Sequence, residues 1–233
     1  RVALAAAAAG ITTPSVRIGP VVEKDWVAES EKSLPALHVG PYFVYGSHIQ
    51  EAAPQDAIAI KIDAGLAFGT GNHETTRGCL QALERLFAEK MPENPIDIGT
   101  GSGILAIALA KRCTAPVMAS DIDPIAIDVA RENAVINGVG DRISFCVTDG
   151  VESDEIGRSM LYDLIVANIV ANPLIALAGG IAGLLSADGH VILSGILNEQ
   201  AEDVTDAYRV EGLVPKDCIE LGNWTTLILA RQP

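Results

Sequence analysis

From Pro95 onward the sequence alternates short apolar segments with helical segments, and this alternation limits the fold more than any other feature. Segments such as PIDIG at 95–99 and LYDLIVAN at 161–168 are dominated by apolar residues, as in strands buried on both faces. The segment PIAIDVARENAVIN, which is closed by Gly138, has helical spacing. Strands of this kind separated by helices predict an α/β fold whose parallel sheet is covered by helices on both faces.

The same reading places the remaining elements. We expect further helices at 75–90, 104–112, 173–185 and 198–212, and further strands at 57–63, 116–121, 142–149, 190–195, 218–222 and 223–233. The last two strands have only a short break at Gly222–Asn223, which predicts an antiparallel hairpin at one edge of the sheet. Before Ala57, β-like runs at 15–22 and 37–45 do not show the alternation of a complete domain, and the polar segment around Trp26 is a short helix or a linker.

The charge balance argues against one class of function. The 233 residues contain 16 Lys and Arg against 30 Asp and Glu, a formal charge of −14, and the pI is near 4.6. Binding of nucleic acid through phosphate neutralisation needs clustered basic side chains, so we expect no direct nucleic-acid partner. Two interpretations of the acidity stay open, namely simple solubility and attraction of cationic partners.

The cysteines and the longest uncharged segment argue against a metal site and against a membrane span. Four widely spaced cysteines, without a CxxC pair, predict buried free thiols in a reducing compartment and no metal site. The uncharged stretch 164–187 contains Asn172-Pro173 and three glycines, which favour a strand, a turn and a helix over a membrane span. We therefore expect a cytoplasmic protein, and we interpret the initial RVALAAAAAG as a helix end exposed by truncation rather than a signal peptide.

The strongest local signal is a glycine-rich loop between a predicted strand and a predicted helix. It reads Asp97-Ile-Gly99-Thr-Gly101-Ser-Gly103, and such a loop lets a ligand approach the backbone at the carboxyl end of a strand. A dinucleotide fingerprint from Gly99 needs its third glycine at position 104, which is Ile104, so an NAD-dependent oxidoreductase ranks low. The absence of GK[ST] excludes a P-loop. The pattern DxGxGxG instead resembles the cofactor loop of class I methyltransferases that use S-adenosylmethionine.

Polar residues end three of the following strands. Asp121 lies 22 residues beyond Gly99, and a carboxylate there can accept hydrogen bonds from both hydroxyls of a ribose. Asp149 either approaches an adenine amino group or belongs to an Asp-Gly turn. Asn168 is the first polar residue after a strand that faces the expected crevice, so it is a candidate to contact substrate or methyl group.

Four longer segments together resemble one family. They are AGLAFGTGNHETT, DIGTGSGILAIALAK, SDIDPIAIDVARENAVINGV and DLIVANIVANPLIALA, and they resemble the PrmA family of bacterial enzymes that methylate ribosomal protein L-11. The resemblance implies a Rossmann-like, seven-stranded class I methyltransferase sheet with an antiparallel edge hairpin. It also implies transfer of methyl groups from S-adenosylmethionine to Lys side chains and to the N-terminal amine of that ribosomal protein.

The resemblance also implies roles for individual residues. The cofactor contacts of the family fall on Thr76, Gly99, Asp121 and Asn168, beside the other members of the glycine loop. Phe68, Gly69 and Thr70 resemble part of a loop that closes over the cofactor. We expect Asn168 to position the amine, with Thr75 or Thr76 assisting. For His73 two roles stay open, acceptance of the proton or a hydrogen bond that orders the loop.

The sequence departs from the family at several points. Thr100 stands where Cys is common, and Asn-Trp-Thr-Thr at 223–226 replaces a more usual Glu-Trp-Cys pattern. The family also has an N-terminal substrate-recognition domain, so we interpret residues 1–56 as its remnant plus a linker, and residues 57–233 as the catalytic domain. The alternatives are a methyltransferase for another protein or a small molecule, and a cofactor-binding fragment without activity. We expect a monomer with no membrane partner.

Overall fold

The structure is a computed structural model that describes residues 12, 35–62, 73–151, 153, 155–156 and 161–232. The expectations for the initial alanine run, for the β-like run at 15–22 and for the segment around Trp26 lie outside these residues.

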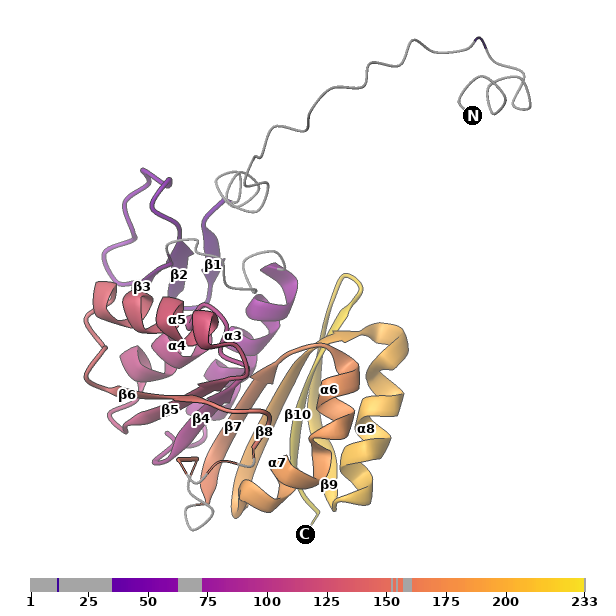
Figure 1. The fold of residues 1–233 in the computed structure, drawn as a ribbon. Helices are drawn as coiled ribbons and strands as arrows, with labels where there is room; N and C mark the ends of the chain where they lie inside the picture. Colours follow the sequence, from indigo (N-terminus) through magenta and orange to yellow (C-terminus); the bar gives the residue numbers. More distant parts are fainter. Residues whose placement is uncertain are drawn as a thin grey trace.

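Seven strands form one large sheet in the order β6–β5–β4–β7–β8–β10–β9 (Figure 1). Neighbouring strands from β6 to β8 pair in parallel, whereas β10 pairs antiparallel with both β8 and β9. The strands are β4 (Pro95–Ile98), β5 (Val117–Asp121), β6 (Ile143–Val147), β7 (Tyr162–Asn168), β8 (Leu185–Leu197), β9 (Leu213–Leu221) and β10 (Trp224–Arg231). This arrangement confirms the predicted α/β fold with a seven-stranded sheet and an antiparallel edge hairpin.

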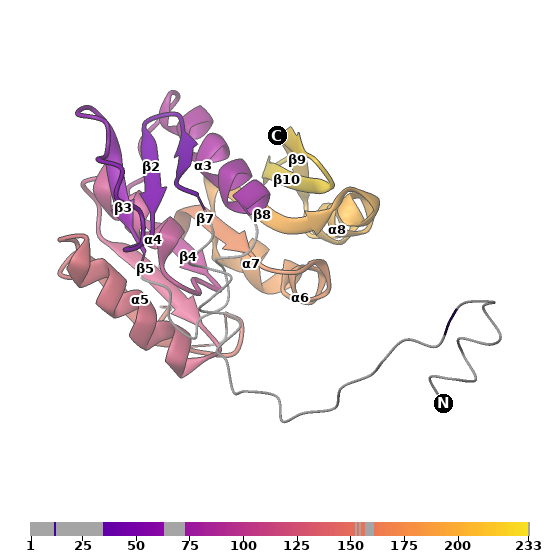
Figure 2. The same cartoon turned by 90° about the horizontal axis from the view of Figure 1, so that it is seen from above.

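Helices cover both faces of this sheet. Helices α3, α4 and α5 lie on one face, and α6, α7 and α8 lie on the other (Figure 2). Successive residues of β7 show why both faces are apolar, since Ile165 packs under one helical layer and Val166 under the other. The helices are α3 (His73–Phe87), α4 (Ile104–Arg112), α5 (Pro124–Ile136), α6 (Ala171–Ala176), α7 (Ala178–Leu184) and α8 (Ala201–Val210), with a short 3₁₀ turn η1 (Asn198–Gln200) before α8.

Three of the predicted elements differ most from the structure. The helix predicted at 173–185 is two short helices, α6 and α7, which meet at Leu177. The predicted strand at 190–195 belongs to the longer β8. Strand β9 begins at Leu213 rather than at 218, because Pro215 is compatible with an edge strand, where a missing N–H breaks no sheet hydrogen bond.

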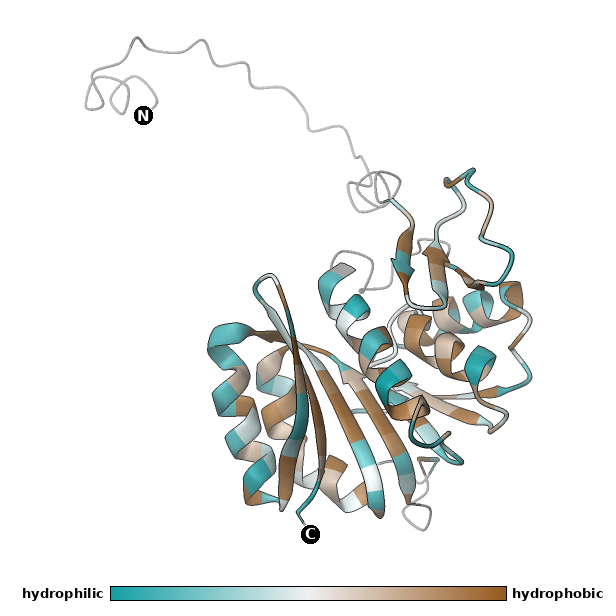
Figure 3. Ribbon diagram, turned by 180° about the vertical axis from the view of Figure 1, so that it is seen from behind, coloured by the Kyte–Doolittle hydropathy of each residue, from teal (hydrophilic) through white to brown (hydrophobic). Residues whose placement is uncertain are grey.

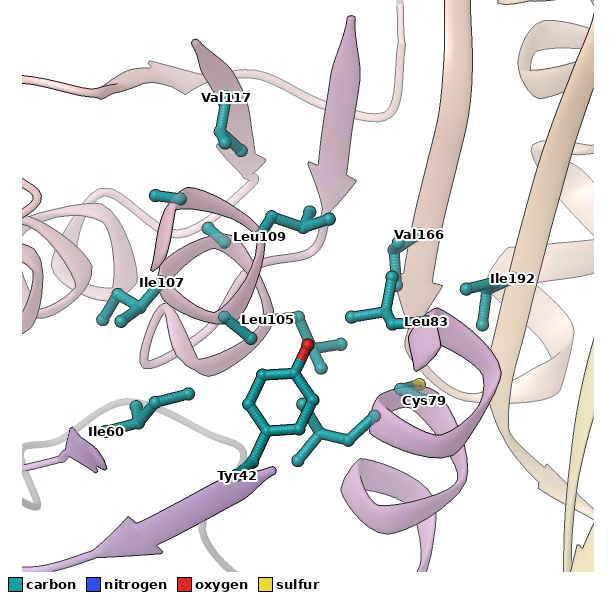
Figure 4. Packing of buried hydrophobic residues seen from close by; sticks show 14 of the residues in the cluster. Tyr42, Ile60, Cys79, Leu83, Leu105, Ile107, Leu109, Val117, Val166 and Ile192 are labelled. Atoms are coloured by element: carbon teal, nitrogen blue, oxygen red, sulfur yellow. The ribbon is translucent and has the colours of Figure 1, made fainter. Parts of the chain in front are cut away.

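A second sheet of three strands packs beside the first. Strands β1 (Leu37–Val39) and β2 (Tyr42–Tyr45) are antiparallel, and β3 (Ile58–Lys61) pairs in parallel with β2. These strands confirm the predicted β-like runs at 37–45 and 57–63. Their apolar side chains join the core formed by α3, α4 and the large sheet (Figure 4). The expectation that residues 1–56 derive from a recognition domain stays a prediction.

Helix α3 lies between the two sheets because its sequence is amphipathic. Cys79, Leu80 and Leu83 recur at helical spacing and are fully buried, whereas hydrophilic residues alternate with them along the helix (Figure 3). On the side of the small sheet, the Tyr42 hydroxyl donates a 2.8 Å hydrogen bond to Oε1 of Glu84. The same carboxylate accepts a 3.2 Å hydrogen bond from Nε of Arg112 on α4. These contacts fix α3, and with it the helix start that borders the site described below.

Among the described residues, no helix combines the length and the apolar character needed to span a bilayer.

The hydrogen bond between Tyr42 and Glu84 gives a direct test of this packing. In Tyr42→Phe the partly buried Glu84 carboxylate loses a donor, so the free energy of unfolding falls by about 1–2 kcal/mol. Urea unfolding followed by circular dichroism measures the change. Tyr45→Phe, on the same strand, is the control and stays within about 0.5 kcal/mol of the parent. Equal effects of the two substitutions would show that the small sheet does not hold α3.

Candidate active site

The large sheet changes direction between β4 and β7, and the candidate site lies at the carboxyl ends of these strands. From β4 the chain moves outward through β5 to β6, and it then returns to the opposite side of β4 with β7. In such sheets the crevice at the reversal point is where ligands bind. Gly99 follows β4 and Asn168 ends β7, so the structure places both predicted residues at this point.

Asp97 is a buried carboxylate at the start of the glycine loop. Its Oδ2 accepts a 2.6 Å hydrogen bond from the Thr100 hydroxyl and a 3.0 Å hydrogen bond from the backbone N–H of Ala106 in the first turn of α4. The negative charge therefore faces a helix N-terminus, which favours it. Burial nevertheless dominates and raises the pKa of Asp97 to about 6. Its Oδ1 is buried and has no hydrogen-bond partner among the described residues.

The glycine loop adopts backbone conformations that side chains rarely tolerate. Gly99, Gly101 and Gly103 have φ angles of 70°, 55° and 86°. At Gly99 a Cβ atom would also lie 2.4 Å from Cγ2 of Ile169, the residue after Asn168. The loop therefore needs glycine at this position both for its conformation and for its contact with the end of β7.

Asp121 joins this loop to the end of β5. Its Oδ2 accepts a 2.8 Å hydrogen bond from the N–H of Gly101, and its Oδ1 accepts a 3.0 Å hydrogen bond from the N–H of Asp123. The residue is half-buried, so its carboxylate also reaches solvent. A carboxylate has about four acceptor positions, and two remain here for the hydroxyl groups of a ligand.

The two other strand-end candidates also reach solvent. Asn168 is half-buried, and within the described ranges its side-chain amide has no hydrogen-bond partner. Asp149 follows β6 and is exposed. Thr148, the residue before Asp149, donates a hydrogen bond from its N–H to the carbonyl of Asp121, so Asp149 lies next to the end of β5. Both side chains can accept a hydrogen bond from a ligand.

The start of α3 borders the site from the side of β8. Thr75 and Thr76 lie on its first turn and are both 5% exposed. The Thr75 carbonyl accepts a 3.3 Å hydrogen bond from the hydroxyl of Ser194, at the end of β8. Phe68, Gly69, Thr70 and the side chain of His73 lie outside the described residues, so their predicted roles stay predictions.

Sequence reasoning missed two apolar residues beside Asp121. Ile122 directly follows β5 and Val147 ends the neighbouring β6, and they are 64% and 49% exposed. From the sequence alone, an apolar residue at the end of a strand is interpreted as part of the core. Only its exposure in the structure shows that it can form a surface for a ligand.

These groups fit the S-adenosylmethionine expected from the glycine loop. Asp121 offers free acceptor positions for a ribose, and the exposed Ile122 and Val147 offer apolar surface for a base. The unpartnered Oδ1 of Asp97 suits an ammonium group, which would also favour the ionised carboxylate. The described residues contain no cluster of three His, Cys, Asp or Glu side chains that could hold a metal ion.

The raised pKa of Asp97 makes stability depend on pH. The folded state binds a proton more tightly than the unfolded chain, whose carboxyl has a pKa near 3.8, so this group lowers stability as pH rises from about 4 to about 6. Asp97→Asn removes this contribution. Urea unfolding without ligand at pH 4, 5, 6 and 7 should show the variant gaining about 1–3 kcal/mol on the parent over that window. Parallel stability curves would contradict the assignment.

Comparisons with known proteins agree with this geometry. The sequence model of a family described as ribosomal protein L11 methyltransferase (PrmA) matches residues 2–232. A protein from Brucella suis named ribosomal protein L11 methyltransferase is 45% identical over 205 residues, which cover 88% of this chain and 72% of that relative.

Solved structures show the same fold. The crystal structure of a ribosomal protein L11 methylase from Lactobacillus delbrueckii subsp. bulgaricus superposes with a TM-score of 0.75 at 32% identity and covers 85% of this chain and 99% of that one. An RNA methyltransferase from Salinibacter ruber, solved with S-adenosyl-L-homocysteine, shares the fold at 21% identity and a TM-score of 0.50, over 63% of this chain and 88% of that one. This chain belongs to the ribosomal protein L11 methyltransferase (PrmA) family.

Proposed function

We propose that this chain transfers methyl groups from S-adenosylmethionine to amino groups of ribosomal protein L11, on Lys side chains and on the N-terminal amine. Membership of the family supports the reaction class and the cofactor. One observation carries the residue assignment. The glycine loop binds Asp121 on one side through the Gly101 N–H, and on the other side it packs against Ile169, next to Asn168. The loop therefore brings a sugar-binding carboxylate and a free amide to the same crevice.

We assign the cofactor contacts to residues of this crevice. Asp121 would accept hydrogen bonds from the ribose, Ile122 and Val147 would contact the adenine, and Asp149 would approach the adenine amino group. The backbone of the glycine loop, together with Thr76, would border the methionine end, and Asp97 would attract its ammonium group. When bound, the cofactor supplies an electrophilic methyl group whose departure leaves a neutral thioether. The protein therefore needs no general acid for the leaving group.

The chain must instead present an uncharged amine in line with the methyl group. A free Lys side chain has a pKa of about 10.4 and an α-amine about 7.7–8.0, so the α-amine needs less help to lose its proton. We assign Asn168 the role of holding the amine through its side-chain oxygen or its backbone carbonyl, with Thr75 or Thr76 assisting. Orientation of this kind accelerates a displacement because the reacting groups meet already aligned.

The charge of the chain suits a basic substrate. Three exposed acidic residues form an acidic rim around the crevice: Glu74 in the first turn of α3, Asp149 after β6 and Glu199 after β8. Such a rim attracts Lys-rich protein and repels nucleic acid, which supports a protein substrate. Cytoplasmic residence and the monomeric state stay predictions.

Methyl transfer to purified ribosomal protein L11 tests the proposal. With radiolabelled S-adenosylmethionine, the parent chain should label L11, and Asn168→Ala should lower kcat by about 10²-fold because the amine is no longer aligned. The matched control is Asn172→Ala, because Asn172 is an exposed residue at the start of α6, four residues after Asn168. This variant should keep parent kcat within about twofold.

Two results would contradict the proposal in different ways. Absence of label in L11 from the parent chain, while a cell extract is labelled, would point to another substrate. Parent turnover in Asn168→Ala would leave the reaction standing and remove the residue from it.

A further inference from the structure

The end of β8 contacts both elements that we place around the amine. Ser194 is the last residue of this strand that pairs with β7, and it stands directly beside Asn168 in the register of the parallel pair. Gly195 follows it in β8. Ser194 is fully buried, so its hydroxyl cannot contact solvent and must be satisfied inside the protein.

The hydroxyl of Ser194 links three elements. It donates to the carbonyl of Thr75 at 3.3 Å, in the first turn of α3. Its oxygen lies 2.7 Å from Oγ1 of Thr226 on β10. Either hydroxyl can be the donor in this second bond. The two contacts connect β8 to α3 and to β10.

Gly195 acts on the other side, against the end of β7. Its φ angle is +82°, and a Cβ atom there would lie 2.4 Å from the carbonyl oxygen and 2.8 Å from the carbonyl carbon of Ile169. These are backbone atoms, so no rotation of a side chain can relieve the contact. The carbonyl group of Ile169, in the peptide unit between Ile169 and Val170, therefore lies directly against Gly195.

The side chain of Ile169 is half-buried, and its Cγ2 packs on Gly99 of the glycine loop. Ile169 thus lies between one glycine of the cofactor loop and one glycine at the end of β8. The contact at Gly195 is made by backbone atoms of Ile169, and the contact at Gly99 is made by its side chain.

We propose that Ser194 and Gly195 form a positioning pair, which holds the Asn168–Ile169 segment and the first turn of α3 in the alignment that methyl transfer to the amine requires. Gly195 sets the position of the Ile169 peptide, and Ser194 sets the position of α3 relative to it. The pair acts through these neighbours and touches neither amine nor methyl group. The inference rests on the proposed function, because it assigns the pair to the same reaction.

The role of Gly195 is tested with two alanine substitutions at glycines that have similar positive φ angles. Gly195→Ala meets the Ile169 backbone, whereas Gly212, with a φ angle of +79°, has no atom within 4 Å of the Cβ position. Both variants carry the strain of a positive φ, and Gly195→Ala adds the contact with Ile169. Gly195→Ala should lower kcat for L11 by about 10²-fold at an S-adenosylmethionine Kd within about threefold of the parent, and Gly212→Ala should keep parent kcat.

The serine half provides a second variant in case Gly195→Ala does not fold. Ser194→Ala should lower kcat by about tenfold with little change in the Kd for S-adenosylmethionine. The control is Thr205→Ala, which removes a hydroxyl from a buried residue on α8, on the opposite face of the sheet. A residue that only stabilises the fold would leave kcat per folded molecule unchanged well below the melting temperature.

Hydrogen exchange separates failure of this inference from failure of the proposed function. Protection of the backbone in residues 162–171 should fall in Gly195→Ala and not in Gly212→Ala, whether or not L11 is a substrate. Parent kcat in Gly195→Ala, equal losses in both glycine variants, or unchanged exchange in residues 162–171 would overturn the inference. An inactive parent chain whose exchange pattern changes as stated would overturn only the choice of substrate.

Discussion

The hydrogen bond from the Gly101 amide to the Asp121 carboxylate is the interaction on which the rest of the site depends. It connects the loop after β4 to the end of β5, and the Ser120 carbonyl strengthens the connection by accepting hydrogen bonds from the N–H groups of Gly99 and Thr100. The loop is thereby held to the end of β5 through its own backbone N–H groups. Asp121 is oriented by the same bond, so one contact shapes both the space and the carboxylate beside it.

The opposite wall of the crevice is built from a different part of the chain. Helix α3 is held on one side by the small sheet, through Tyr42 and Glu84, and on the other by the buried hydroxyl of Ser194. Its first turn therefore has a fixed position relative to the end of β7. The small sheet, which is distant in sequence from the glycine loop, contributes to the site through this helix.

The order of strands and helices could be predicted from the sequence, because apolar segments on both faces and helical spacing are local signals. The glycine loop, Asp121 and Asn168 could be placed for the same reason, since each follows a recognisable strand. The start of β9 and the break at Leu177 could not, because an edge position and a meeting of two helices depend on neighbours far away in sequence.

The contacts of Gly195 were equally invisible, since they involve the backbone of another strand. Ile122 and Val147 have the apolar character of core residues, and only the structure shows that they are exposed.

The most direct test of the account is the affinity for S-adenosylmethionine, measured by titration calorimetry on the parent chain, on Asp121→Asn and on Asp128→Asn. Asp128 is an exposed residue of α5 and serves as the charge-matched control. The account predicts that the parent binds, that Asp121→Asn binds at least about tenfold more weakly, and that Asp128→Asn binds like the parent. Equal affinities for all three proteins, or a parent chain that does not bind at millimolar ligand, would contradict it.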